Sequence, residues 1–322
     1  MDGPLGKILS EIREKGFITF DRFVELSLYD SGGYYTSKRL SLKPGEDFFT
    51  APELSPLFGK VLSSYIEKLK ESFKLPLNLV EIGAGKGFLA KDLLKFLKPK
   101  AYFVVEKRGE VPFLKGKVKW LNSLKELPNL RGFVVANELF DAFPFKRLVK
   151  EKGKLFEVVV AEEEGELKEE LRPFQGSIEP LEGGEYPLFV GWKELLREVY
   201  LKLEEGVFVV FDYGGSFGEV ASKRSFRAFR NGKIVNDYLK EVGKTDLTAC
   251  VDFDRLKRLS EEIGFKVLEF KPLGAFLLEN GIEKFASFKE LPAVLTLLVD
   301  MGRKFKVLVL LKERGQAPSG KA

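Results

Sequence analysis

The feature that most constrains this chain is a glycine-rich turn, GAGKG, between a short apolar run and a helical pattern. Residues 77–82 (LNLVEI) have the length and apolar character of a buried strand, and apolar residues recur at helical spacing over residues 88–97. Glycine lacks the Cβ that would keep a ligand away from the backbone. The sequence therefore predicts a strand, a ligand-binding turn and a helix in succession.

The same alternation continues along the chain and predicts a parallel sheet covered by helices on both faces. A hairpin is expected around Lys152 and Gly153, followed by an acidic insertion to about Gly184, and residues 31–55 predict a long ordered loop. Helices are predicted at residues 5–15, 19–28, 55–73, 88–97, 192–203 and 254–263, and further strands at 102–106, 118–121, 132–136, 207–212, 265–270 and 305–311.

The composition excludes several classes of site. The chain has no His and a single Cys, so neither a Cys/His zinc site, a Ser-His-Asp triad nor a disulfide scaffold can be built from it, and we expect no metal site. The 53 Lys+Arg and 48 Asp+Glu residues are interspersed, which gives no electrostatic argument for nucleic acid or a membrane surface.

Apolar runs are too short to span a bilayer, and the first residues do not resemble a secretory signal. We therefore expect a cytoplasmic protein. Abundant Lys and Glu with little Gln, Cys and Met are typical of thermophile proteins.

Carboxylates flank the glycine turn and indicate the charge of its ligand. Glu81 precedes the turn and would repel a pyrophosphate, and Phe88 stands where a dinucleotide-binding turn has its third glycine. Glu106 ends the next predicted strand, 19 residues after Gly87, where a carboxylate can accept both ribose hydroxyls. These acids favour a cationic adenosyl ligand, S-adenosylmethionine. Asn122 is either a contact to the adenine edge or an ordinary turn residue.

A second group of polar residues, NELFDAFP at 137–144, follows the strand predicted at 132–136. Ligands of open α/β sheets bind at the carboxyl ends of strands, so we expect the chemistry here. Glu138 and Asp141 could hold the planar guanidinium of an arginine bidentately. Alternatively, they cap the next helix or pair with Lys146 and Arg147.

Other polar residues could complete a substrate cleft or serve as caps and turns. Residues 45–55 carry Asp47 and Glu53, and Asp212 ends a later strand. Residues 223–230 (KRSFRAFR) interleave bases with aromatics, which suits either a nucleic acid or, more simply, a strand with alternating faces. Cys250 is expected to be a small buried thiol.

The order of these motifs resembles the MidA-like S-adenosylmethionine-dependent methyltransferases, whose members include a mitochondrial complex I assembly-factor arginine methyltransferase. The resemblance runs from about Gly32 to Leu311. It is carried by Gly33-Tyr34-Tyr35, GEDFFTAPELSPLFG, EIGAGKG, ANELFDAFP, DYG and TDLTACVDF. Two residues depart from the family pattern: Cys250 stands where a histidine is usual, and Leu273 where a glutamine is frequent.

The resemblance implies a class I methyltransferase (Rossmann-like) fold, with a seven-stranded sheet whose last strand is antiparallel, an N-terminal helical cap and an inserted hairpin and helical segment. We expect the cap and substrate loop at residues 1–75, the core at 76–145 and 200–313, the insertion at 146–199, and a disordered tail at 314–322. The expected site residues are Glu138 and Asp141 for catalysis, Glu81, Gly83, Gly85, Gly87, Glu106, Asn122 and Asn137 for the cofactor, and Tyr35, Asp47, Glu53 and Asp212 for the substrate.

The leading hypothesis is N-methylation of arginine in a partner protein, with no nucleic-acid or membrane partner. Methylation of a small molecule or RNA, and a non-catalytic assembly factor that keeps the cofactor pocket, are the alternatives. The identity of the methyl acceptor, the degree of methylation and the oligomeric state do not follow from the sequence.

Overall fold

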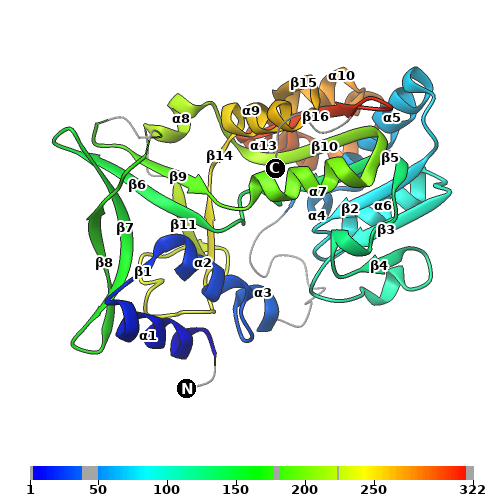
Figure 1. Ribbon diagram of the computed structural model, residues 1–322. Helices are drawn as coiled ribbons and strands as arrows, with labels where there is room; N and C mark the ends of the chain where they lie inside the picture. Colours follow the sequence, from blue (N-terminus) through cyan, green and yellow to red (C-terminus); the bar gives the residue numbers. More distant parts are fainter. Residues whose placement is uncertain (1–2, 38–49, 177, 179–181, 223–224, 317–322) are drawn as a thin grey trace. The chain divides into compact units, whose positions relative to one another are not determined.

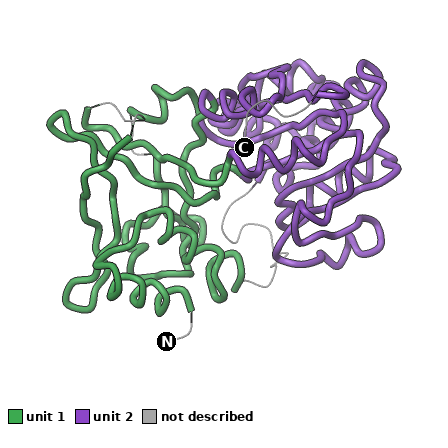
Figure 2. Tube along the Cα trace, viewed as in Figure 1, with its two compact units in different colours: residues 1–48, 140–192, 215–253 green, residues 49–139, 193–214, 254–322 purple. Residues whose placement is uncertain are grey.

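The computed structural model describes residues 3–37, 50–176, 178, 182–222 and 225–316 (Figure 1). The chain forms two compact units, each assembled from separate segments (Figure 2). Unit 1 comprises residues 1–48, 140–192 and 215–253, and unit 2 comprises residues 49–139, 193–214 and 254–322.

Unit 2 is built on a mixed sheet with the strand order β15-β16-β10-β5-β2-β3-β4. Strands β4, β3, β2, β5 and β10 are parallel, and β16 is antiparallel to both of its neighbours. The predicted α/β fold, with an antiparallel last strand, is confirmed. The strands are β2 (Asn78–Ile82), β3 (Ala101–Val105), β4 (Lys119–Leu121), β5 (Leu130–Asn137), β10 (Leu203–Gly215), β15 (Lys266–Pro272) and β16 (Phe305–Lys312).

The strand order reverses at β2, because the chain adds β3 on one side of it and β5 on the other. In such sheets the loops after the strands on the two sides diverge and leave room for a ligand at their carboxyl ends. The glycine turn follows β2 directly, so the fold places it at this point.

Local signals mark the start of helix α5. Ser55 caps α5 by accepting a hydrogen bond from the Leu57 amide (3.2 Å), and Pro56 occupies the first turn. A Cβ at Gly59 would lie 2.5 Å from the Asp92 Cβ, so a glycine lets α5 approach α6. The helices are α4 (Ala51–Leu54), α5 (Pro56–Phe73), α6 (Phe88–Phe96), α7 (Trp192–Lys202), α9 (Phe253–Ile263), α10 (Leu273–Glu279), α11 (Ile282–Phe285), α12 (Leu291–Leu295) and α13 (Met301–Lys304).

Unit 1 combines short helices with two antiparallel sheets. One sheet has the order β1-β7-β6-β9, with β8 also paired to β7, and the other has the order β12-β11-β13. Its helices are α1 (Pro4–Lys15), α2 (Phe20–Tyr29), α3 (Tyr34–Ser37) and α8 (Phe217–Ala221); its strands are β1 (Ile18–Thr19), β6 (Phe145–Glu151), β7 (Lys154–Glu163), β8 (Glu166–Pro173), β9 (Glu185–Phe189), β11 (Phe226–Arg230), β12 (Lys233–Ile234), β13 (Asp246–Ala249) and β14 (Val251–Asp252).

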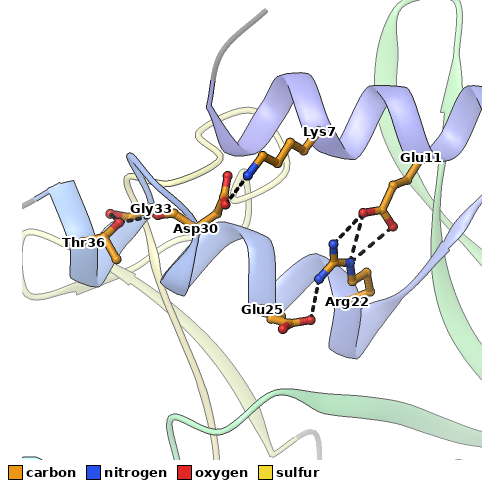
Figure 3. Close-up of polar contacts among 7 residues, drawn as sticks. All are labelled: Lys7, Glu11, Arg22, Glu25, Asp30, Gly33 and Thr36. Atoms are coloured by element: carbon orange, nitrogen blue, oxygen red, sulfur yellow. Dashed lines mark hydrogen bonds and ion pairs between the residues drawn. The ribbon is translucent and has the colours of Figure 1, made fainter. Parts of the chain in front are cut away.

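Ion pairs join the first two helices (Figure 3). The Arg22 guanidinium on α2 donates to the Glu11 carboxylate on α1, with Nη2–Oε1 at 2.7 Å, and also to Glu25. Near the start of α1, the Lys7 ammonium pairs with Asp30. Ion pairs therefore connect α1 both to α2 and to Asp30, the residue that follows α2.

A buried arginine lies in the core of unit 1. The Arg147 guanidinium, on β6, donates two hydrogen bonds to the Glu185 carboxylate (2.9 and 3.0 Å) and one to the Tyr238 hydroxyl (3.1 Å). It also pairs with Glu169. The rings of Phe20 and Phe226 lie 4.7 and 4.8 Å from the guanidinium carbon. These contacts tie strands β6, β8, β9 and β11 to α2.

Several sequence predictions need correction. The stretch 31–55 is not a continuous loop: its described part forms α3 and α4, because Pro52 occupies the first turn of α4 and Ser55 ends it. The acidic insertion after the hairpin contains β8, which pairs with β7 along its length. Its residues are mostly exposed and do not alternate in polarity, so the period of a strand is hidden.

The boundaries of the two units also differ from the predicted domains. Residues 215–253, assigned to the core from sequence, group with the N-terminal helices and the insertion. The physical reason is a shared apolar cluster in which Val220 and Ala221 pack with Leu148 and Tyr186. The predicted tail comprises residues 314–322, and its part from residue 317 onward lies outside the described residues.

The strand interpretation of the basic-aromatic stretch is confirmed. In β11, Phe226 and Ala228 are buried, and the Arg230 guanidinium is paired with Asp237 at 2.9 Å. Among the described residues, no helix is long and apolar enough to cross a membrane. Within the same part of the chain, no group of three or more His, Cys, Asp or Glu side chains could hold a metal ion.

The Arg147 cluster gives a stability prediction. We expect Arg147→Ala to lower the free energy of unfolding by about 3–5 kcal/mol, because it leaves Glu185 and Glu169 without their buried cation. Urea unfolding followed by circular dichroism measures this. The matched variant Arg13→Ala, at an exposed position of α1, should change it by less than about 0.5 kcal/mol. Equal effects of the two variants would contradict the assignment.

Candidate active site

The glycine turn after β2 has a backbone that favours glycine at three places. Gly83, Gly85 and Gly87 have φ values of 73°, 54° and 76°, in the left-handed region that other residues enter only with strain. A Cβ at Gly83 would lie 3.0 Å from the Leu139 Cδ1. The turn after β2 and the loop after β5 are therefore in contact.

The Glu106 carboxylate anchors this turn. It follows β3, is 8% exposed, and its Oε2 accepts a hydrogen bond from the Gly85 amide at 3.0 Å. Its Oε1 accepts from the Arg108 amide at 3.0 Å, and the Arg108 guanidinium lies 3.6 Å away. The acid predicted to hold a ribose therefore also fixes the backbone of the glycine turn.

Glu81 lies inside the sheet, immediately before the turn. Its Oε2 accepts a hydrogen bond from the Tyr102 hydroxyl at 2.7 Å, and both side chains are buried. Burial raises the pKa of Glu81 to about 7, the Tyr102 hydrogen bond lowers it, and the nearby Glu106 raises it. At neutral pH Glu81 is therefore only partly ionised, so it repels an anion less than the sequence alone indicated.

Glu53, on α4, contacts the glycine turn through a cation. The Lys86 ammonium, from the middle of the turn, lies 3.3 Å from the Glu53 Oε2. The sequence assigned Glu53 to the substrate, and the structure brings it to the turn after β2. This pair connects two segments that are 33 residues apart.

The loop after β5 holds a non-glycine residue in a left-handed conformation. Glu138 has φ 53°, its amide donates to the Phe211 carbonyl (2.8 Å), and its Oε1 accepts from the Asn137 amide group (3.1 Å). The Asp212 carboxylate is fully buried and accepts from the amides of Leu139 (3.2 Å) and Tyr213 (2.9 Å). Asp212 therefore fixes the loop that carries Glu138. Non-glycine residues with positive φ are often found at functional sites.

The remaining predicted residues have other surroundings. Asp141 belongs to unit 1, where it accepts a hydrogen bond from the Thr248 hydroxyl at 2.8 Å, and burial raises its pKa. Tyr35, also in unit 1, donates to Asp246 at 2.9 Å. Asn122 is exposed after β4, and Asp47 lies outside the described residues.

Three residues with direct roles in this geometry were absent from the sequence-based assignment: Lys86, Tyr102 and Arg108. Lys86 was visible inside the glycine motif, and Arg108 two residues after Glu106. Tyr102 could not be recognised from the sequence, because a tyrosine within an apolar strand is usually a core residue.

The turn after β2 fits a cofactor with an adenosyl group and a positive charge. Three left-handed glycines leave the backbone open, and the Glu106 carboxylate can accept hydrogen bonds from ribose hydroxyls. The cations at this turn, Lys86 and Arg108, lie 3.3 and 3.6 Å from the carboxylates of Glu53 and Glu106, so they are balanced by acids and do not form the cluster of uncompensated cations that a diphosphate requires.

Comparison with known proteins decides the family. Residues 57–271 match the model of the family described as "Putative S-adenosyl-L-methionine-dependent methyltransferase". The chain belongs to this methyltransferase family. A relative from Drosophila melanogaster, "Protein arginine methyltransferase NDUFAF7 homolog, mitochondrial", is 31% identical over 315 residues, covering 81% of this chain and 71% of the relative.

Two further proteins are similar to this methyltransferase over most of its length. The Bos taurus protein "Protein arginine methyltransferase NDUFAF7, mitochondrial" is 25% identical, covering 87% of this chain and 73% of the relative. A crystal structure of a Burkholderia thailandensis protein bound to S-adenosyl-homocysteine is similar, with a TM-score of 0.87 and 26% identity, over 98% of this chain and 93% of that one. The cofactor of this methyltransferase is S-adenosylmethionine.

The buried Glu81 predicts a pH-dependent stability of the methyltransferase. Its pKa is about 7 when folded against a usual 4.5, so between these values the folded state keeps a proton that the unfolded state has lost. Stability from this group is present below pH 4.5 and is lost as the pH rises through 7, by about 3 kcal/mol. We expect Glu81→Gln to remove this dependence in urea unfolding between pH 4.5 and 8.

Tyr102→Phe should move the same loss of stability to higher pH, because the hydroxyl that favours the ionised carboxylate is absent. If wild type and Glu81→Gln followed the same pH profile, Glu81 would not be the titrating group.

A second prediction concerns the turn itself. Gly85→Val puts a branched side chain into a left-handed backbone at the proposed cofactor contact, and we expect loss of S-adenosylhomocysteine binding in calorimetry. Gly116→Val is the matched control: it has φ 73° in the same unit, with nothing within 4 Å of its added Cβ. It should bear similar strain and still bind. Binding by Gly85→Val would exclude this turn as the contact.

Proposed function

We propose that this methyltransferase N-methylates arginine in a partner protein. Two facts support the proposal: the relatives that match most of the chain carry the name protein arginine methyltransferase, and the loop after β5 presents the Glu138 carboxylate. Bound S-adenosylmethionine supplies an electrophilic methyl group on its sulfonium. The residues of the chain must therefore hold an acceptor nitrogen in line with that group.

The glycine turn and its anchor hold the cofactor in this proposal. Gly83, Gly85 and Gly87 admit it to the backbone, Glu106 binds its ribose, and Glu81 supports the turn from inside the sheet. Asn137 ends β5 beside Glu138, and Asn122 follows β4, so both stay proposed cofactor contacts.

We propose Glu138 as the catalytic residue because its backbone and side chain are held in a defined conformation. The left-handed backbone, the amide bond to Phe211 and the side-chain bond from Asn137 give its carboxylate one orientation. A carboxylate can accept hydrogen bonds from a guanidinium, fix its plane and concentrate positive charge on the bonded nitrogens. Asp212, which holds the Leu139 amide, is a positioning residue for this loop.

Asp141 has a weaker geometric case for catalysis than Glu138. Its carboxylate accepts from Thr248 within unit 1, which is the contact of a residue that fixes a turn. Tyr35 and Asp47 stay predictions for substrate binding.

Replacing Glu138 by Gln tests the role directly. We expect turnover to fall at least about 100-fold, since the neutral amide has no negative charge and only one acceptor oxygen for a guanidinium, while S-adenosylhomocysteine affinity stays within about threefold. Labelled S-adenosylmethionine with cell extract, followed by identification of the labelled residue, measures turnover and acceptor together.

The companion variant Asp141→Ala should lower stability more than turnover, because it removes the acceptor of the Thr248 hydrogen bond. Wild-type turnover in Glu138→Gln would remove its catalytic role. Label on RNA or a small molecule would favour the alternative acceptors, and cofactor binding without any label would favour an assembly factor.

A further inference from the structure

The ion pair between Lys86 and Glu53 lies at the glycine turn, and its side chains are 20% and 6% exposed. Desolvation raises the pKa of Glu53 above its usual value, and the charge of Lys86 and its hydrogen bond oppose this rise only in part. The Glu53 carboxylate is therefore buried, which disfavours its charged form, and it lies directly beside the Lys86 ammonium.

A lysine in the middle of this turn attracts phosphate groups. A glycine-rich turn that carries a lysine and leads into a helix is a general phosphate-binding arrangement, and here α6 begins at Phe88, directly after Gly87. Adenine nucleotides share their adenosine with S-adenosylmethionine but carry phosphates. A site for this cofactor must therefore reject anions that would otherwise fit.

The amides of the three glycines are already bonded to oxygens of the protein. The Gly83 amide donates to the Val105 carbonyl (2.9 Å), the Gly85 amide to Glu106 (3.0 Å) and the Gly87 amide to the Ala84 carbonyl (2.8 Å). The positive charge within the turn is therefore that of the Lys86 ammonium, while the nearby Arg108 guanidinium lies 3.6 Å from the Glu106 carboxylate.

We propose that Glu53 is a specificity-determining residue that excludes phosphate-bearing adenine nucleotides from the cofactor site by neutralising Lys86. Glu53 acts through Lys86, so it is a positioning and charge-balancing residue. The inference rests on the cofactor site at the glycine turn, and it is independent of whether arginine is the methyl acceptor.

Calorimetric titration of the full chain with ADP and with S-adenosylhomocysteine tests the proposal. We expect Glu53→Gln to raise ADP affinity about tenfold at low salt, because a carboxylate 3.3 Å from the ammonium no longer opposes the phosphate. Affinity for S-adenosylhomocysteine should change less than about threefold. Adding Lys86→Met to Glu53→Gln should return ADP affinity to the wild-type value.

Salt and a distant carboxylate provide the controls. The gain in ADP affinity should shrink as ionic strength rises, since it is a charge effect. Glu71→Gln changes the net charge equally at an exposed position near the far end of α5, and should leave both affinities unchanged.

The proposal is overturned if folded Glu53→Gln, shown by retained S-adenosylhomocysteine binding, binds ADP no better than wild type, or if Glu71→Gln gives the same gain. Should Glu53→Gln fail to fold, the exchanged pair Glu53→Lys with Lys86→Glu restores the attraction. It must exclude ADP as wild type does, and its failure to do so would also contradict the proposal. All these results concern binding, so failure of arginine methylation would not produce them.

Discussion

One hydrogen bond, from the Gly85 amide to the Glu106 carboxylate, joins the turn after β2 to the residue after β3. The two strands are parallel neighbours, so both segments leave the same edge of the sheet. Because Glu106 holds the turn, the three glycines keep a left-handed backbone in a fixed place. The contact of Gly83 with Leu139 then sets the loop after β5 beside it.

The carboxylates around the glycine turn differ in how far they are ionised and in which groups balance their charge. Glu81 is buried against Tyr102 and is partly protonated near neutral pH, whereas Glu53 is balanced by Lys86. Glu106 accepts hydrogen bonds from the Gly85 and Arg108 amides and is the residue predicted to bind a ribose. Counting carboxylates in the sequence therefore assigned too much negative charge to Glu81.

The sequence predicted features that depend on nearby residues. The turn at Gly83 to Gly87 and the hairpin at Lys152 and Gly153 follow from local backbone preferences, and the structure has them. The grouping of residues 215–253 and the Lys86–Glu53 contact join distant segments, and no local signal encodes them. The pairing of β8 with β7 is local, across a turn at Glu164 and Gly165, but the exposed, non-alternating residues of β8 hide its strand period. The residues predicted for catalysis and for binding stay predictions until variants are measured.

The central claim is that the turn after β2 takes a positively charged adenosyl donor and rejects adenosyl ligands that carry phosphates. Its most direct test is calorimetry of the wild-type protein with S-adenosylmethionine, NADH and ATP at equal concentrations. We expect saturable binding of S-adenosylmethionine with one site per chain, and no saturable heat from the other two. Tight binding of NADH or ATP, with S-adenosylmethionine ignored, would contradict the account.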